Sequence, residues 1–213
     1  LTEEIDVAVL QSALDVTVRR FPSMCVRLRR GLFWYYFQQR ERAPAVREEN
    51  SYPVTRMSRR EIRTCAFRVI VYEKRIAVEF FHAVTDGNGG MVFLKSLTAE
   101  YLQQKYGIAV PATEGVLGRL EEPREEELED SFLKYAGNVN ASRREPNAWH
   151  PWGTPESDGF LNLTCFRMET KAVLEKAHAY DVSLTAFLCA ALMMALQDMQ
   201  AEQVPSLRAR KPI

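Results

Sequence analysis

The chain of 213 residues has few cysteines, modest amounts of glycine and proline, and no long apolar run. Its 4 cysteines are scattered and form no CxxC pair, which argues against a disulfide scaffold and against a thiolate zinc site. Ten glycines and ten prolines exclude a fibrous or linker-dominated chain. No stretch reaches about 18 consecutive apolar residues, and the opening LTEE does not have the pattern of a signal peptide. We therefore expect a cytoplasmic protein without a membrane span.

The chain also has no net charge, because its 28 basic residues balance 28 acidic ones. Hydrophobic residues make up 46% of the chain and charged residues 26%, which is typical of a globular protein with a sizeable core. Residues 1–75 carry a net charge of +6, residues 76–160 a net charge of −7, and residues 161–213 a net charge of +1. This distribution favours segments that complement one another, without the dense basic face of a nucleic-acid-binding domain.

The first part of the chain predicts a helix followed by a β-hairpin. Asp6 has the pattern of an N-cap, apolar residues then recur at helical spacing, and Pro22 ends the helix. Residues 24–29 alternate between apolar and polar side chains, as a half-buried strand does. Gly31 marks a turn, and residues 32–38 are rich in aromatic side chains with strong strand propensity.

A second hairpin and a long helix follow. Residues 39–63 are polar and predict irregular structure or a short edge strand, whereas residues 65–72 and 75–81 predict two paired strands. The turn at residues 85–90 is rich in residues that tolerate a positive φ. It leads into a predicted helix over residues 91–105.

The remaining chain has less pattern. Residues 112–158 predict a long connection with a possible short helix over residues 125–135. Residues 161–168 have strand character, and residues 171–180 and 183–200 predict two helices. The last of these is apolar almost all round, so we expect a buried core helix.

The residues that point to chemistry are HAVTDG, directly after the second hairpin. His82 ends a strand and faces the loop side, where its imidazole can accept a proton near neutral pH. Asp86 lies across a tight turn and would hold the turn or the imidazole ring, and Gly87 would let the backbone bend. The structural alternative is a histidine satisfied by a core hydrogen bond and an aspartate that caps a turn. The residues alone leave both interpretations open.

Residues 75–102, RIAVEFFHAVTDGNGGMVFLKSLTAEYL, resemble the HxxxDG region of the chloramphenicol acetyltransferase-like superfamily, which includes alcohol acetyltransferases and peptide-synthetase condensation domains. RFPSMCVR at 20–27 is similar to the segment that joins the family's first helix to its second strand. DVSLTAFL at 181–188 is similar to the helix that opens its second half. GLFWYY at 31–36 looks closest to the alcohol acetyltransferase branch, whereas Phe81 stands where condensation domains usually carry a second histidine.

The resemblance implies an α/β (α+β) fold, a two-layer sandwich of a mixed sheet and helices. It also implies an acyltransferase that moves an acyl group, in the simplest case acetyl, from CoA to an alcohol or amine. The family's catalytic histidine, matched by His82, deprotonates the acceptor. Its aspartate, matched by Asp86 and followed by Gly87, pairs with an arginine. Arg27 matches that arginine best, and Arg29 is a weaker candidate on the same strand face.

The implied partners are acyl-CoA as co-substrate and a small hydroxyl or amine acceptor, with no tightly bound cofactor, no nucleic acid and no metal. Two alternatives stay open. One is a condensation-like domain that acts on carrier-protein thioesters, and the other is a non-catalytic acyltransferase-like half-domain that binds a partner.

The resemblance covers only about the first half of the family fold and the opening helices of the second half. Residues 1–111 would form the N-terminal half with the HxxxDG motif, 112–158 a crossover, and 159–213 the start of the C-terminal half. The family's later DFGWG motif is absent from this sequence, which would fit either a fragment of a longer protein or a stand-alone half-domain. We expect the fragment, because residues 208–213 resemble a chain that is cut just before a strand. Such a chain should expose apolar surface and self-associate through it.

Other side chains of chemical interest receive structural interpretations. The cysteines are predicted to be small core residues rather than nucleophiles: Cys25, Cys65, Cys165 and Cys189. His150 is predicted to pack in a loop, His178 lies near a helix end, and three dispersed histidines predict no metal site. The arginines of residues 56–63 are predicted to form a solvated face, with contact to CoA phosphates as the alternative.

Overall fold

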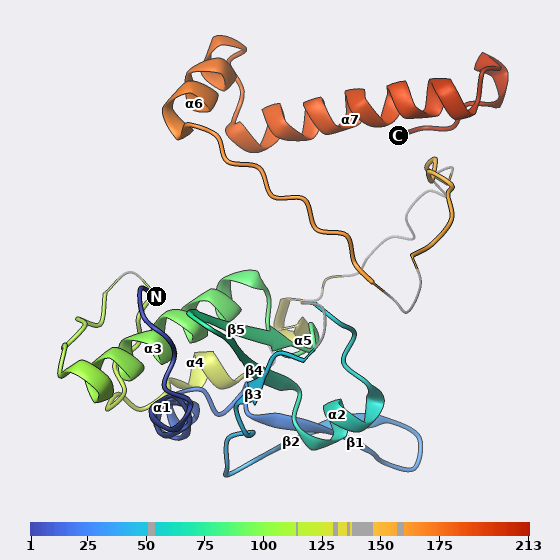
Figure 1. Ribbon diagram of the computed structural model, residues 1–213. Helices are drawn as coiled ribbons and strands as arrows, with labels where there is room; N and C mark the ends of the chain where they lie inside the picture. The colour runs from blue at the N-terminus through green and yellow to red at the C-terminus, as the bar shows by residue number, and fades with distance from the viewer. Residues whose placement is uncertain (51–53, 114, 130–131, 136, 138–146, 157–159) are drawn as a thin grey trace. The chain divides into compact units, whose positions relative to one another are not determined.

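The computed structural model shows a mixed α/β chain with two small sheets, which confirms the α+β class (Figure 1). The chain divides into two compact units, Leu1–Lys134 and Tyr135–Ile213, which are described separately below. The structure describes residues 1–50, 54–113, 115–129, 132–135, 137, 147–156 and 160–213.

The helices and strands of the first unit are, in chain order, α1 (Val7–Arg20), β1 (Val26–Arg30), β2 (Tyr35–Gln39), β3 (Arg47–Glu48), α2 (Arg59–Thr64), β4 (Phe67–Tyr72), β5 (Arg75–Phe80), α3 (Gly87–Tyr106) and α4 (Glu125–Leu128). The short helix α5 (Phe132–Tyr135) lies at the boundary between the units. The second unit contains α6 (Thr170–Ala179), α7 (Leu184–Gln203) and a 3-10 turn (Leu207–Ala209).

The core of the first unit lies between one sheet and two helices. The sheet has the order β3-β4-β5, in which β3 is parallel and β5 antiparallel to β4. Alternate residues of β4 point to the face that α1 and α3 cover, as the strand pleat requires. The buried side chains there include Leu10, Leu14 and Val18 of α1, Phe67, Val69 and Val71 of β4, and Phe93, Leu97 and Tyr101 of α3. A smaller cluster of Val26, Ile62 and Ala66 packs α2 against β1.

Several predicted elements of this unit are confirmed. Asp6 caps α1, because its Oδ1 accepts hydrogen bonds from the backbone amides of Ala8 at 3.0 Å and Val9 at 3.1 Å. Both hairpins form, with β1 antiparallel to β2 and β4 antiparallel to β5. The expected short edge strand is β3, which is only two residues long. The possible short helix over residues 125–135 appears as the separate helices α4 and α5.

The helix α2 was missed by the sequence analysis, although its signal is present. Ser58 and Glu61 form a capping box, in which the Glu61 amide donates to the Ser58 hydroxyl at 3.2 Å and the Ser58 amide donates to the Glu61 carboxylate at 2.8 Å. The S-x-x-E spacing predicts such a box before an amphipathic turn. α3 likewise begins earlier than predicted, at Gly87, because Asp86 caps it.

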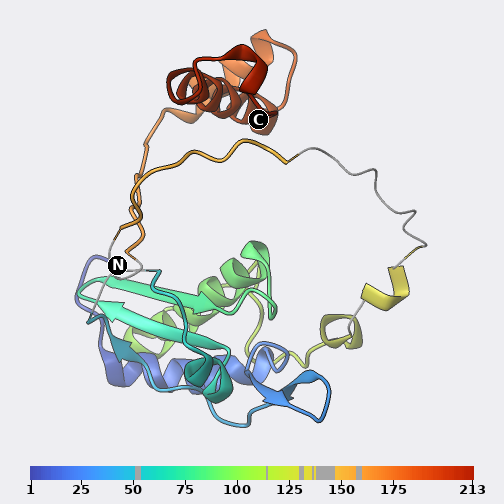
Figure 2. The same cartoon turned by 90° about the vertical axis from the view of Figure 1, so that its right-hand side faces the viewer.

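The β1–β2 hairpin exposes aromatic side chains. Its connecting loop lies at the edge of the first unit in both views (Figure 1 and Figure 2). Leu32 is 82% exposed and Phe33 is 92% exposed, and every residue of β2 is exposed. The second strand begins at Tyr35, so residues 32–34 lie outside the strand predicted over residues 32–38. The expected exposure of apolar surface is confirmed, and self-association through it stays a prediction.

Two expectations for the second unit are wrong. Residues 160–169, which include the predicted strand over 161–168, have no regular secondary structure and are almost entirely exposed. A strand needs a neighbour for its backbone groups, and in the described part of the chain none pairs with this segment. The predicted helices form as α6 and α7, but α7 is not buried: only Gln200 among its residues is.

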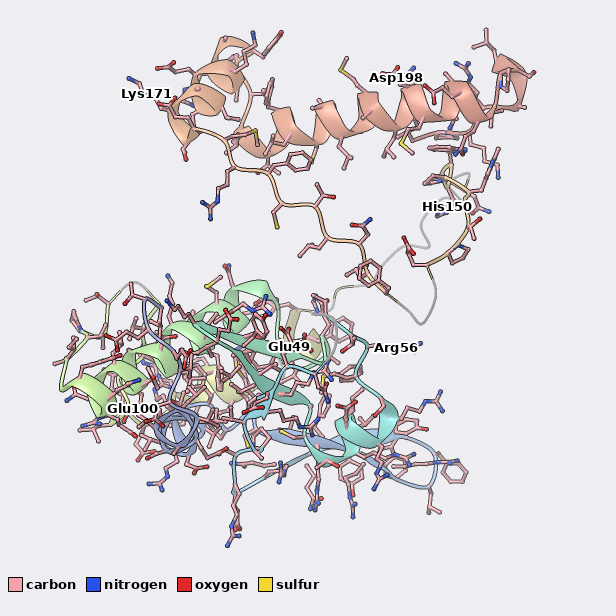
Figure 3. All side chains as sticks on the ribbon, in the orientation of Figure 1. Glu49, Arg56, Glu100, His150, Lys171 and Asp198 are labelled. Atoms are coloured by element: carbon pink, nitrogen blue, oxygen red, sulfur yellow. The ribbon has the colours of Figure 1, made fainter. Side chains whose placement is uncertain are left out.

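The side chains of α7 stand out from the ribbon along most of its length (Figure 3). Leu192, Met193 and Met194 are each more than half exposed. With 20 residues, α7 is long and apolar enough to cross a membrane, and the core helix of a soluble protein can have the same length and composition.

Candidate functional site

His82 occupies a turn directly after β5. The Phe81 amide donates to the Ala66 carbonyl at 2.8 Å, and the Val84 amide donates to the Phe81 carbonyl at 2.8 Å. The Phe81 ring also meets the Phe37 ring edge-on, with a centroid separation of 6.3 Å. These contacts anchor Phe81 and hold the turn, while the side chain of His82 is exposed. The histidine therefore lies at a strand end that is open to solvent.

Asp86 serves as the N-cap of α3. Its Oδ1 accepts a hydrogen bond from the Gly89 amide at 2.8 Å, and its carbonyl accepts one from the Gly90 amide at 3.0 Å. This capping fixes the start of α3 at Gly87, five residues after His82. Asp86 thus has the turn-capping role that was the structural alternative for an HxxxD aspartate.

The glycines after Asp86 provide room rather than an unusual backbone conformation. None of Gly87, Gly89 and Gly90 has a positive φ, so the tolerance for a positive φ noted in the sequence is not used at these glycines. A Cβ atom on Gly89 would lie 2.1 Å from Oγ1 of Thr85, whereas one on Gly87 would have no neighbour within 4 Å. Gly89 is therefore the glycine that the close approach of Thr85 requires.

Arg27 does not contact Asp86 in this structure. Its Nε donates to Oε1 of Gln38 at 3.1 Å, across the β1–β2 hairpin. Arg29, the weaker candidate, is exposed on β1. The ion pair that the resemblance predicts is thus not formed, because the Arg27 guanidinium is bound to Gln38 and the Asp86 carboxylate to the backbone of α3.

Two cavities meet at His82. The larger has a volume of about 1130 Å³ and is lined by α2, the residues before it, and the end of β5. The smaller, of about 330 Å³, is lined by Asp86 and the first turns of α3 together with Val78 and Phe80 of β5. His82 lines both cavities. A molecule bound at the His82 end of either cavity would lie next to the imidazole.

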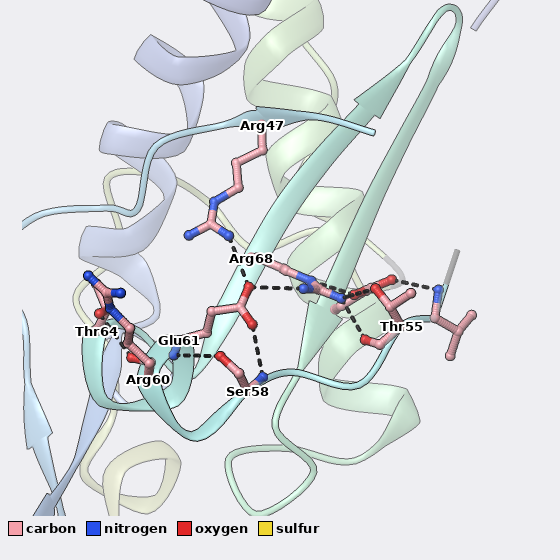
Figure 4. Close-up of polar contacts among 9 residues, drawn as sticks. Arg47, Thr55, Ser58, Arg60, Glu61, Thr64 and Arg68 are labelled. Carbon is pink, nitrogen blue, oxygen red and sulfur yellow. Dashed lines mark hydrogen bonds and ion pairs between the residues drawn. The ribbon is translucent and has the colours of Figure 1, made fainter. Parts of the chain in front are cut away.

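A buried arginine holds the wall of the larger cavity together (Figure 4). Arg68 of β4 is 8% exposed, and its Nε donates to Glu79 of β5 at 2.6 Å. Its Nη1 donates to Glu61 at 3.1 Å, and its Nη2 donates to the carbonyl and the hydroxyl of Thr55, at 2.6 and 3.0 Å. The Val54 amide donates to the second oxygen of Glu79 at 2.9 Å. The segment before α2 is therefore tied to the sheet by charge-assisted hydrogen bonds.

Glu61 connects this network to the start of α2. Hydrogen bonding from the Ser58 backbone, aided by the guanidinium groups of Arg68 and Arg47, lowers the pKa of Glu61 to about 2. This network was not predicted from the sequence. The antiparallel register pairs Arg68 with Glu79. A basic residue within one apolar strand and an acidic residue within the next were the sequence signal for this ion pair.

Two of the four cysteines form a buried pair. Cys25 and Cys65 are buried, as predicted, whereas Cys165 and Cys189 are exposed, so the prediction of core positions is wrong for these two. A hydrogen bond between the buried thiols lowers the pKa of Cys65, to which the Arg40 guanidinium adds, and the same bond raises the pKa of Cys25.

The other two histidines lie in the second unit. His150 follows the buried Trp149, and His178 lies in the last turn of α6. In the part of the chain that the structure describes, no three His, Cys, Asp or Glu side chains gather as metal ligands would.

The chain has no significant match to a protein-family model, to a curated protein or to a solved structure. The resemblance to the chloramphenicol acetyltransferase-like superfamily therefore rests on the sequence motifs described above. The geometry around His82 is the basis for a functional proposal.

Proposed function

We propose that the protein is an acyltransferase that moves an acyl group, in the simplest case acetyl, from CoA to a small alcohol or amine. The observation that carries this proposal is the exposed imidazole of His82, which lies on the shared wall of two cavities. Val78, Phe80 and Phe81 make the wall beside it apolar, which suits an acyl chain or the carbon skeleton of an acceptor.

In the proposed reaction His82 acts as a general base. Its imidazole takes the proton from the acceptor hydroxyl or amine while the acceptor atom attacks the thioester carbonyl. The new C–O or C–N bond forms, the C–S bond breaks, and the CoA thiolate leaves and receives the proton from the imidazolium. Asp86 is a positioning residue in this scheme, because it caps α3 and thereby orients the turn that carries His82.

The proposed fold is the two-layer sandwich of the chloramphenicol acetyltransferase-like superfamily. A sheet of β3, β4 and β5 with α1 and α3 against one face is compatible with one half of such a sandwich. In this proposal acyl-CoA is a co-substrate rather than a resident cofactor.

The test is the release of free thiol from acetyl-CoA in the presence of a panel of alcohols and amines. We expect His82→Ala to lower the rate by about 100-fold or more, which is the usual contribution of a general base. The matched controls are His150→Ala and His178→Ala, which remove the other two described histidines and should retain the wild-type rate.

A His82→Ala variant with the wild-type rate would overturn the catalytic assignment. Turnover only with carrier-protein thioesters would favour the condensation-like alternative. Stable binding of a partner without any turnover would favour the non-catalytic half-domain.

A further inference from the structure

Three arginines on the wall of the larger cavity have no acidic partner. Arg56, Arg59 and Arg63 line the same cavity as His82. Within the described residues, none of their guanidinium groups forms an ion pair or a hydrogen bond. Their positive charges are therefore not neutralised by the protein.

Three other arginines of this unit are paired with carboxylates, whereas Arg60, which does not line the cavity, has no such partner among the described residues. Arg47 and Arg68 bind Glu61, Arg68 also binds Glu79, and Arg75 binds Glu49. Among the described residues that line the cavity, Glu79 alone carries a carboxylate, and Arg68 already binds it. The described lining thus combines three uncompensated positive charges with apolar side chains such as Ile62 and Phe81.

The three arginines are held on a fixed support. Arg59 and Arg63 are four residues apart in α2, so both lie on one face of this helix. Arg56 follows Thr55, whose carbonyl and hydroxyl both bind Arg68. It precedes Met57, which packs against the cluster of Val26, Ile62 and Ala66. The backbone that presents the charges is therefore fixed before any ligand arrives.

Two positive charges four residues apart on a helix, such as Arg59 and Arg63, repel each other and destabilise the helix. A bound anion would relieve this repulsion. The guanidinium group is the side chain best suited to a phosphate, because its planar N–H groups match the geometry of the phosphate oxygens.

We propose that Arg56, Arg59 and Arg63 form a subsite for a phosphate group of a substrate. The apolar part of the cavity leads the rest of that substrate towards His82. The subsite itself depends only on the arginines, whereas the reaction at His82 rests on the proposed function. The phosphate that binds this subsite would belong either to CoA or to the acceptor.

The experiment measures binding by titration calorimetry, so it does not depend on turnover. The probes are CoA against pantetheine, which has the same thiol arm without the nucleotide, and phenyl phosphate against phenol. We expect the variant R56Q/R59Q/R63Q to weaken binding of a phosphate-bearing probe by about 30-fold or more, because each lost charge-assisted hydrogen bond weakens binding several-fold. Pantetheine and phenol should bind the variant and the wild type equally.

The matched control is Arg60→Gln, because Arg60 lies on the same helix but does not line the cavity. We expect less than about a twofold change, since an exposed charge away from the ligand contributes little. Circular dichroism melting of each variant establishes that it is folded, and single variants at each position replace the triple variant if it is not.

Loss of CoA affinity alone supports the subsite and assigns it to the donor, whereas loss of phenyl phosphate affinity alone supports it and assigns it to the acceptor. Wild-type affinity for both probes in the triple variant overturns the proposal. An equal loss of affinity in Arg60→Gln also overturns the proposal, because it would indicate general charge attraction. A wild-type protein that binds neither CoA nor phenyl phosphate overturns it as well. If His82→Ala retains turnover while the triple variant still loses binding, the subsite stands and the catalytic role of His82 fails.

Discussion

The more apolar of the helices α1 and α7 is the less buried one. α1 has charged and polar residues on one side, yet it buries six residues, including Leu10, Ala13 and Leu14. α7 is apolar almost all round and buries only Gln200. The difference lies in their surroundings, because α1 packs against α3 and β4, while within its own unit α7 is contacted by α6 and by the residues near Trp152 and Lys211.

Apolar composition alone therefore does not bury a helix. Burial requires a second apolar surface of matching shape, and the first unit supplies one from β4 and α3. In the described part of the second unit only Trp149, Ala177 and Gln200 are buried. The first unit therefore has the features of an independent core, and the second does not.

The largest expected effect comes from removing one leucine from each helix. Leu14→Ala should lower the free energy of unfolding by about 3 kcal/mol, because it leaves a cavity in the core. Leu192→Ala, at a position that is 61% exposed, should lower it by less than about 0.5 kcal/mol. Urea unfolding followed by circular dichroism measures both. Equal losses would mean that α7 is covered in solution, which would contradict the difference in burial between the two helices.

A smaller effect is expected from acid, and it should be confined to the first unit. Since the pKa of Glu61 is lowered to about 2, its charged form stabilises the fold above the usual pKa of 4.5. This stabilisation is lost as the pH falls from 4.5 towards 2. Glu61→Gln should therefore cost about 1–2 kcal/mol at pH 7 and little near pH 2.

The control for this prediction is Glu175→Gln in α6. Glu175 forms an exposed ion pair with Lys171 at 3.8 Å, and its removal should cost less than about 0.5 kcal/mol. Urea unfolding at pH 7 and at pH 2.5 distinguishes the two carboxylates. A loss for Glu61→Gln that is the same at both pH values would contradict the assigned cause.

The smallest effect concerns the turn that carries His82. Gly89→Ala should lower the free energy of unfolding by about 1 kcal/mol, because the new Cβ atom would overlap with Oγ1 of Thr85. Gly87→Ala should be neutral or slightly stabilising, since alanine favours a helix and nothing lies within 4 Å. The double variant T85A/G89A removes the overlapping hydroxyl and should recover most of the loss in thermal unfolding. A Gly89→Ala protein as stable as the wild type would show that Thr85 moves away without cost.

The elements that were predicted correctly are those with a local signal. The cap at Asp6 and the two hairpins each follow from residues close together in the chain. His82 likewise follows from its position at the end of an apolar strand. The strand predicted over residues 161–168 failed, because a strand depends on a partner that its own residues do not specify.

Only part of the candidate site could be predicted from local sequence signals. The HxxxDG motif located His82 and Asp86, but the wall of the cavity depends on Arg68, whose partners are 7, 11 and 13 residues away. The family resemblance also implied a pair between Arg27 and Asp86, and the structure instead gives each a different partner.

Local chemistry in the chain was enough to specify the cap at Asp6, the two hairpins and the residue that presents the imidazole, because those choices involve neighbours within a few positions. Packing of the folded chain alone determined that α1 is covered and α7 is exposed, which of the arginines meet a carboxylate, and that Arg56, Arg59 and Arg63 share a cavity with His82. The physical reason is that burial and ion pairing depend on distances between segments, and these distances exist only once the segments have packed together.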